Sequence, residues 1–237
     1  MGADAELAIL VQSLQKLEAV NSIIAVLVAF IAANVLRTTI RFDYAVLLCT
    51  GLVLAAIASG IVDIGHWATV FKSQIDLVGT EVDHPAIAKL QALMMSESVS
   101  LNYFIGQYLG FIIASKVFFA LLVARWWQAR LYNPGGFRKE FGSFTLSAAV
   151  VVGILFSVIL LEFFAPEVAG AGWIMMIPVV LLGVAVFHQL VIARFNLSSG
   201  WVVLFYLVLP LTHSLVAVLG CMDSFFNIRK RFDRAVG

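Results

Sequence analysis

Long, nearly uninterrupted apolar runs separated by short polar patches extend from Val20 to Cys221. The chain is 62% hydrophobic and only 12% charged over 237 residues, and its mean hydropathy is +1.02. A water-soluble fold of this length has too little interior to bury so much apolar surface, so lipid must surround most of the chain. The sequence therefore predicts an integral, multi-pass membrane protein.

Six of the apolar runs are long enough, or nearly so, to cross a bilayer, because a crossing takes roughly 20 helical residues. Continuous runs without alternation favour helices over a transmembrane β-barrel. The expected fold is all-α, a bundle of six transmembrane helices over residues 20–222 with a basic tail at 223–237. The predicted spans cover residues 20–36, 44–66, 103–124, 145–165, 172–193 and 201–222.

The first 19 residues have a different pattern from the spans. Five apolar residues recur there at helical spacing, and they are Leu7, Leu10, Val11, Leu14 and Leu17. Three acidic residues and one lysine precede the first span, which is the reverse of the basic start of a signal peptide. The pattern predicts an amphipathic helix over residues 1–19 that lies on the membrane surface.

The distribution of positive charge gives no orientation. Six spans would place both termini on the same side of the membrane. Lys116 falls inside a span, and the other 14 of the 15 lysines and arginines divide into seven on each side. The seven on the terminal side are Lys16, Lys72, Lys89, Arg229, Lys230, Arg231 and Arg234. The positive-inside rule therefore does not choose between the two orientations.

Small residues recur at four-residue spacing in two of the spans. Ala25, Ala29 and Ala33 form one stripe, and Gly106 and Gly110 belong to another. Such stripes let helix backbones approach closely in lipid. We expect them to pack within the bundle, and the alternative is that they pair this chain with a protein partner or with a second copy.

The segment that follows the third span combines aromatic and basic residues with a turn. Asn133-Pro134-Gly135-Gly136 predicts a tight turn, because proline stops a helix and glycine permits positive φ. Tryptophan, tyrosine and arginine favour the headgroup level of the bilayer. The residues expected to contact lipid at this interface are Arg125, Trp126, Trp127, Arg130 and Tyr132.

Polar residues inside the predicted spans are the candidates for contact with a ligand, because ionisable groups are costly in lipid. Lys116, His188, Thr212 and His213 form this set. Pro210 precedes two of them, and a proline kink can free backbone carbonyls to line a cavity. The alternative for Lys116 is that its long side chain reaches toward the interface instead.

No pattern in the chain indicates catalysis. The nucleophile, zinc-protease and phosphate-loop motifs are missing from the sequence. His188 and His213 differ in membrane depth by about 10 Å, which is too far to share one metal ion. A formal charge of +1 gives no reason to expect nucleic-acid binding. We therefore expect neither enzymatic activity nor a cofactor nor a metal site.

Three segments resemble the YybS-like family of bacterial polytopic membrane proteins, a domain of unknown function. They are ARWWQARLYNPGGFRKEF, GVAVFHQLVIARFNLSSGWVVLFYLVLP and LGCMDSFFNIRKRF. The resemblance is strongest over residues 100–234, and its specific motifs are the NPGGF turn and the D-S-x-F-[ND]-x-R pattern. It implies a bacterial inner-membrane location and a cytoplasmic C-terminus, and it implies no catalytic residues. Members of this family usually begin with additional membrane helices.

Two functions fit these observations. The first is a membrane subunit that binds a small molecule or supports its transport, similar to the substrate-capturing components of vitamin importers. The second is a structural or assembly partner within a larger membrane complex.

Overall fold

The computed structural model describes residues 2–39, 41–61, 69–70, 73, 92, 99–164, 170–192 and 199–234. All regular elements over these ranges are helical, which confirms the all-α prediction for this part of the chain. The longer helices are α1 (Gly2–Thr39), α2 (Phe42–Ala58), α5 (Val99–Tyr132), α7 (Ala148–Phe164), α8 (Gly170–Phe187) and α10 (Ser199–Phe226). The short ones are α6 (Gly136–Gly142), the π-helical turn η2 (His188–Ile192) and α11 (Ile228–Arg234).

Within the described residues, three helical segments are long and apolar enough to cross a membrane, namely Glu18–Thr39, Gly172–Leu190 and Gly200–Phe226. They support a membrane protein, but the predicted count of six spans is not confirmed. Two predicted spans are shorter than expected, because α2 and α7 have 17 residues each. The end of the predicted span 44–66 lies outside the described residues. The predicted span 103–124 lies within α5.

The N-terminal helix is longer than the sequence suggested. A surface helix over 1–19 followed by a span requires a break near residue 19, but α1 continues through that point to Thr39. The physical reason is local, because neither glycine nor proline occurs between Ala3 and Thr39 to end the helix. The tail is likewise shorter than predicted, since α10 continues through Phe226 and α11 follows it.

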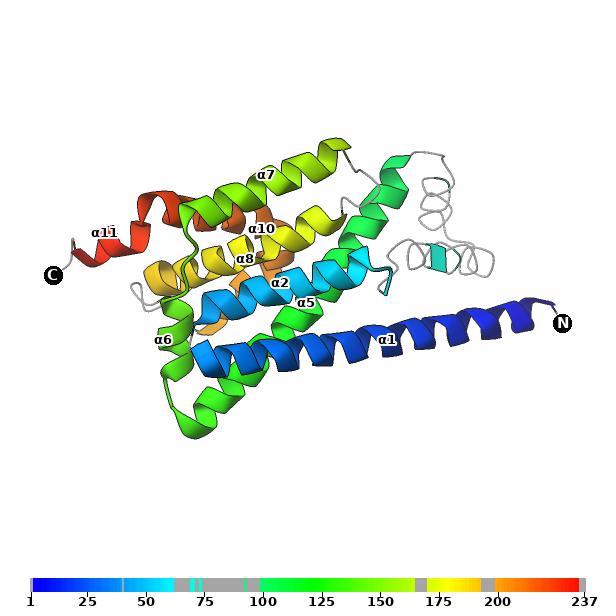
Figure 1. Cartoon of the computed structure of the whole chain (residues 1–237), viewed down its shortest axis with the longest axis horizontal. Helices are drawn as coiled ribbons and strands as arrows, with labels where there is room; N and C mark the ends of the chain where they lie inside the picture. The colour runs from blue at the N-terminus through cyan, green and yellow to red at the C-terminus, as the bar shows by residue number, and fades with distance from the viewer. Residues whose placement is uncertain are drawn as a thin grey trace.

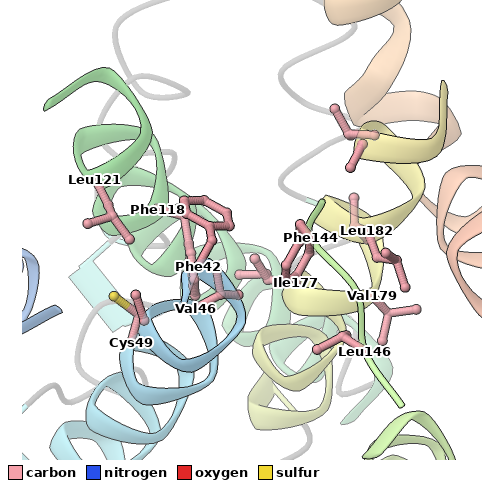
Figure 2. Close-up of a cluster of buried hydrophobic side chains, with 14 of the residues drawn as sticks. Phe42, Val46, Cys49, Phe118, Leu121, Phe144, Leu146, Ile177, Val179 and Leu182 are labelled. Atoms are coloured by element: carbon pink, nitrogen blue, oxygen red, sulfur yellow. The ribbon is translucent and has the colours of Figure 1, made fainter. Parts of the chain in front are cut away.

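Helix α8 forms the centre of the structure. It contacts α2, α5, α7 and α10, and 56% of its apolar stretch is buried, against 11% for α10 (Figure 1). The core lies where α8 meets α2, α5 and the segment between α6 and α7 (Figure 2). Ten of its side chains are Phe42, Val46, Cys49, Phe118, Leu121, Phe144, Leu146, Ile177, Val179 and Leu182.

Many large apolar side chains lie on the outside of the structure. Phe119 on α5, Phe163 on α7 and Leu211 on α10 are exposed, and Leu211 has an exposed fraction of 85%. A water-soluble protein rarely presents such extended apolar surface. The outer face therefore has the composition expected of a protein that lipid surrounds.

The two halves of α10 run along α8 in opposite directions, and Pro210 separates them. Tyr206, before the proline, lies against His188 at the C-terminal end of α8. His213, just after it, lies against Trp173 near the N-terminal end of α8. Beyond His213 the contacts move back along the chain, since Val216 and Gly220 lie against Val179 and Gly183 in the middle of α8, and Arg229 reaches Gln189 after its C-terminal end. This is the path of a helix that bends at its proline, where one backbone hydrogen bond is missing.

The bend changes where the chain ends. Figure 1 shows α1 beginning at one end of the long axis and α11 finishing at the other. The physical cause of this arrangement is α10, which returns toward the end of the molecule where it started. The expectation that both termini share one side of the membrane assumed six straight crossings, and it stays a prediction.

Candidate functional site

The four predicted ligand-facing residues do not form one site. Lys116 is exposed on the outer face of α5, and no ion pair is found for it among the described residues. Thr212 donates a hydrogen bond to the carbonyl of Val208 one turn earlier, at 3.1 Å, so its hydroxyl is turned toward its own helix. His188 and His213 lie toward opposite ends of α8 and have different partners.

His188 is held by groups of the protein itself. It begins the π-helical turn η2, and its Nε2 lies 2.7 Å from the hydroxyl of Tyr206 on α10. The ring also meets Phe141 edge to face, with centroids 6.2 Å apart. Its neighbour Phe187 stacks on Phe205 at 3.9 Å. These contacts join the end of α8 to the first half of α10, which is a structural role.

His213 lies in an aromatic setting built by three helices. Its ring centroid is 4.9 Å from that of Trp173 on α8 and 5.7 Å from that of Phe111 on α5. Phe111 and Trp173 also meet each other edge to face at 6.5 Å. All three side chains are partly exposed. We call these three residues the His213 cluster.

The hydrogen bonds of His213 define its chemistry. Nδ1 lies 2.8 Å from the carbonyl oxygen of Pro210, which can only accept, so Nδ1 carries the proton. In the neutral ring, Nε2 is then a free acceptor. The hydrogen bond described for Nε2 is with the hydroxyl of Ser214 at 3.5 Å, the outer limit of a hydrogen bond. The cluster thus offers an acceptor nitrogen that the described residues satisfy poorly.

The predicted turn after α5 is confirmed. α5 ends at Tyr132, and Gly135 adopts a φ of 85° immediately before α6. At Gly136 an added Cβ would lie 2.8 Å from Cγ of Asn133, so a larger residue would displace that side chain. The geometry of the turn therefore requires glycine at position 135, where φ is positive, whereas a side chain at position 136 would only have to displace that of exposed Asn133.

The predicted interface residues differ in their surroundings. Arg125 donates from Nε to Oε2 of Glu140 at 2.7 Å and from Nη2 to Oε1, and it also binds Gln128 at 2.7 Å. Its guanidinium is thus occupied within the protein rather than free for lipid phosphate. The other four members of the predicted set are exposed, and they are Trp126, Trp127, Arg130 and Tyr132.

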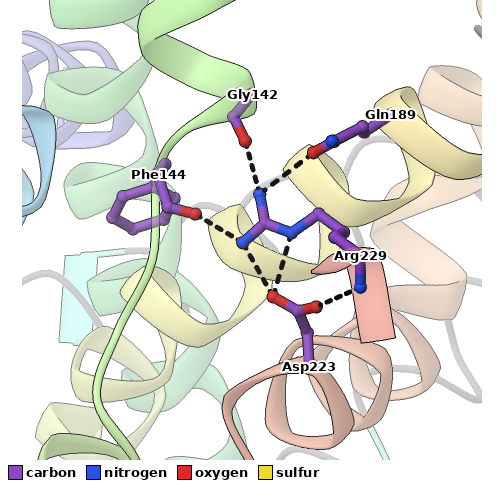
Figure 3. Close-up of polar contacts among 5 residues, drawn as sticks. All are labelled: Gly142, Phe144, Gln189, Asp223 and Arg229. Carbon is purple, nitrogen blue, oxygen red and sulfur yellow. Dashed lines mark hydrogen bonds and ion pairs between the residues drawn. The ribbon is translucent and has the colours of Figure 1, made fainter. Parts of the chain in front are cut away.

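A buried ion pair between Asp223 and Arg229 is the most extensive polar site in the described structure (Figure 3). Each side chain has an exposed fraction of only 6%. Nε and Nη2 of Arg229 bind the same Asp223 oxygen at 2.9 and 2.7 Å. Nη1 and Nη2 also donate to the carbonyls of Gly142 and Phe144, at 2.6 and 2.7 Å. We call this arrangement the Asp223–Arg229 clasp.

The local sequence explains how the clasp forms. Asn227 has a φ of 49°, a conformation that asparagine tolerates, and it separates α10 from α11. The second oxygen of Asp223 accepts from the backbone N–H of Arg229 at 3.1 Å, which caps the start of α11. Asp223, Asn227 and Arg229 are three of the four fixed polar positions of the D-S-x-F-[ND]-x-R pattern, and Ser224 is the fourth. The sequence marked that pattern as specific but assigned its residues no role.

The closest helix packing occurs at glycines outside the predicted stripes. A Cβ on Gly183 of α8 would lie 2.7 Å from the carbonyl carbon of Val216 on α10. A Cβ on Gly220 would lie 2.9 Å from the backbone nitrogen of Gly183 and even closer to the carbonyl oxygen of Val179. The α8 and α10 backbones therefore touch here, and only glycine fits at both positions.

The predicted stripe on α1 is displaced from the buried face. Ala25 and Ala29 are only partly buried and Ala33 is exposed, whereas Ala32 is fully buried. Val28 and Leu36 flank Ala32 on the same face of the helix and are also buried. The other predicted pair, Gly106 and Gly110, lies in α5, but the surroundings of these glycines fall outside the described residues.

Comparison of the chain with protein-family models, curated proteins and solved structures found no match. The resemblance to the YybS-like family therefore stays a prediction from the sequence.

Proposed function

We propose that this protein is a membrane-embedded subunit that binds a small molecule at the His213 cluster, without catalysis. The observation that carries the proposal is the poorly satisfied Nε2 of His213 in a partly exposed aromatic setting. An unsatisfied acceptor is costly in an apolar environment, so a donor from a ligand would lower the free energy there. The proposed location, a bacterial inner membrane, rests on the resemblance to the YybS-like family.

The surroundings of His213 indicate the chemistry of the ligand. Nε2 requires a donor, such as a hydroxyl or an N–H group. Trp173 and Phe111 offer ring faces and edges to an apolar or aromatic body. Because the cluster is formed by α5, α8 and α10 within apolar stretches, the ligand would reach it from the bilayer or from a membrane interface. We therefore expect a molecule with one hydrogen-bonding group on an apolar frame.

Native mass spectrometry of protein purified in mild detergent tests this proposal. We expect a retained small molecule in the unmodified protein and its loss in His213→Leu, which keeps an apolar side chain but removes both nitrogens. Lys116→Met is the matched control, because Lys116 is exposed and takes part in none of the ring contacts and hydrogen bonds described for the cluster. Retention of the same molecule by His213→Leu, or no retained molecule in repeated preparations, would contradict the proposal.

A second proposal is that the protein is an assembly partner in a larger membrane complex. The observation that favours it is the exposed outer face of α10, where apolar residues recur at helical spacing. These residues are Leu204, Leu207, Leu211, Leu215 and Val218. Co-purification in mild detergent should recover a partner that is lost when Leu207, Leu211 and Leu215 are all changed to alanine. Protein that always migrates alone would rule this role out.

A further inference from the structure

Three basic segments that are distant in the sequence lie at one end of the structure. The ring of Phe42, at the start of α2, is 5.9 Å from that of Phe141 in α6 and 5.5 Å from that of Phe144. Arg229, in α11, binds the carbonyls of Gly142 and Phe144. The junction of α1 and α2 and the start of α11 thus both contact the C-terminal end of α6, and the turn between α5 and α6 lies at the same end of the molecule (Figure 1).

The carboxylates described at this end are already paired. Asp43 accepts from Arg41 at 3.2 and 2.5 Å, and these hydrogen bonds raise the pKa of the Arg41 guanidinium. Glu140 and Asp223 are held by Arg125 and by Arg229 in the same way. None of these three acids is therefore available to neutralise further positive charge.

Six other cations at this end are exposed, and no ion pair is found for them in the described part of the chain. They come from α1, from the end of α5, from α6 and from α11, and they are Arg37, Arg130, Arg138, Lys139, Lys230 and Arg231. We call them the basic rim. Such a concentration of charge of one sign attracts anions at physiological ionic strength.

We infer that the basic rim binds the headgroups of anionic phospholipids in the leaflet that surrounds it. Exposed Trp126, Trp127 and Tyr132 lie on α5 beside Arg130, and such residues favour the level of the headgroups. Phe119 and Val123 are exposed further back along the same helix, where acyl chains would contact them. Cations near an anionic leaflet are attracted to it individually and additively.

The same observations favour lipid over an acidic protein as the occupant. A soluble acidic partner would match the charges, but it would leave the neighbouring indole and phenol rings unexplained. A phospholipid accounts for both the cations and the rings, because its phosphate binds the cations while its hydrocarbon covers the apolar residues on the same helix. The partner is therefore identified by two chemistries that occur together in a phospholipid.

Titration of the purified protein with phosphatidylglycerol or phosphatidylcholine of identical acyl chains tests the inference by native mass spectrometry. We expect tighter binding of phosphatidylglycerol. The variant Arg130→Gln/Arg138→Gln/Lys230→Gln should weaken that binding by tenfold to about a hundredfold, since each cation near a surface contributes similarly. Binding of phosphatidylcholine should stay unchanged, and the preference should fall as salt is raised.

The control is Lys16→Gln/Lys116→Gln, which removes exposed cations outside the basic rim. Lys16 lies about 32 Å from Arg37 along α1, so its loss should leave the preference intact. Equal binding of the two lipids, an unchanged preference in the triple variant, or an equal loss in the control would each overturn the inference. Melting temperatures of all variants separate a lost site from a lost fold. None of these outcomes depends on a ligand at His213.

Discussion

At the scale of single residues, the Asp223–Arg229 clasp matters because removing one partner costs far more stability than the intact pair contributes. A buried pair that is fully hydrogen bonded contributes little net stability, since desolvating both charges offsets their attraction. Removing one partner is different, because the other charge then stays buried without compensation. The carbonyls of Gly142 and Phe144 would also lose their donors.

The first prediction concerns this pair. Asp223→Leu or Arg229→Met alone should lower the free energy of unfolding by about 3–5 kcal/mol, because each leaves one buried charge unpaired. The double variant should be less destabilised than the sum of the two. Chemical unfolding in detergent, followed by tryptophan fluorescence, measures all three. Additive losses would show that the two side chains act independently.

Arg41→Gln provides the contrast for the clasp. Arg41 also pairs with an aspartate, but its side chain has an exposed fraction of 55%. Solvent screens such a pair, so we expect no measurable change in unfolding for this variant. An effect as large as that of Arg229→Met would contradict the importance assigned to burial.

The clasp also shows where sequence reasoning at this scale ends. The pattern from Asp223 to Arg229 is local, and it could be recognised as specific. The carbonyls that Arg229 binds belong to Gly142 and Phe144, 87 and 85 residues earlier in the chain. No backbone carbonyl has a signature in the sequence, so this partner could not be predicted. The same holds for His213. Its Nε2 is left poorly satisfied only because the side-chain rotamer of His213 brings Nδ1 to the carbonyl of Pro210, and the sequence does not specify that rotamer.

At the scale of elements, the crossing of α8 and α10 is the tightest helix contact described. Gly183 and Gly220 face each other across it, with the backbones too close for any Cβ. Contact of this kind stabilises helices in lipid, where the hydrophobic effect does not drive association between them. It also fixes the second half of α10, from which the clasp and the His213 cluster both project.

The second prediction tests that crossing. Gly183→Ala and Gly220→Ala should each destabilise the protein by about 3 kcal/mol or more, because the new methyl group meets backbone that cannot move aside. Gly51→Ala is the matched control, since Gly51 is also helical and has no atom within 4 Å of an added Cβ. That variant should be neutral or slightly stabilising. Thermal unfolding in detergent gives the comparison, and equal effects at all three positions would refute the assigned contact.

Elements with local signals were the predictable ones. The helices follow from apolar run length, and the turn before α6 follows from Asn-Pro-Gly-Gly. The packing glycines were not predicted, because Gly183 has no small residue four positions away on either side and Gly220 has only Ser224. The stripe on α1 shows a related limit, since Ala25 packs against the core but the fully buried alanine of this helix is Ala32. Alanine spacing marks a face that could approach another helix, but burial of Ala32 depends on where the neighbours lie.

At the scale of the whole molecule, the bend in α10 bears on the even division of lysines and arginines between the two sides of the membrane. The count gave seven cations to each side because every apolar run was assumed to cross. In the structure α10 returns, so α11 lies beside the segment between α6 and α7, where Arg229 binds the carbonyls of Gly142 and Phe144. The basic residues of three segments then gather at one end. The number of crossings could not be predicted from hydropathy alone, since a bent helix and a straight one have the same composition.

The third prediction follows from this arrangement. The basic rim should face the cytoplasm by the positive-inside rule, and the N-terminus of α1 should lie on the opposite side. In a variant with Cys49→Ala and Cys221→Ala, the added Lys230→Cys should react with a membrane-impermeant maleimide only from the cytoplasmic side. Lys16→Cys should react only from the other side. Labelling of both positions from the same side would restore the arrangement expected for six straight crossings.

The clasp has a consequence for the order of events during biosynthesis. The carbonyls of Gly142 and Phe144 emerge long before the guanidinium that binds them. Until Arg229 has been translated, the segment between α6 and α7 must rely on water, lipid headgroups or the insertion machinery for its hydrogen bonds. Nascent chains halted just short of Arg229 should therefore be more sensitive to protease at this segment than chains extended beyond it.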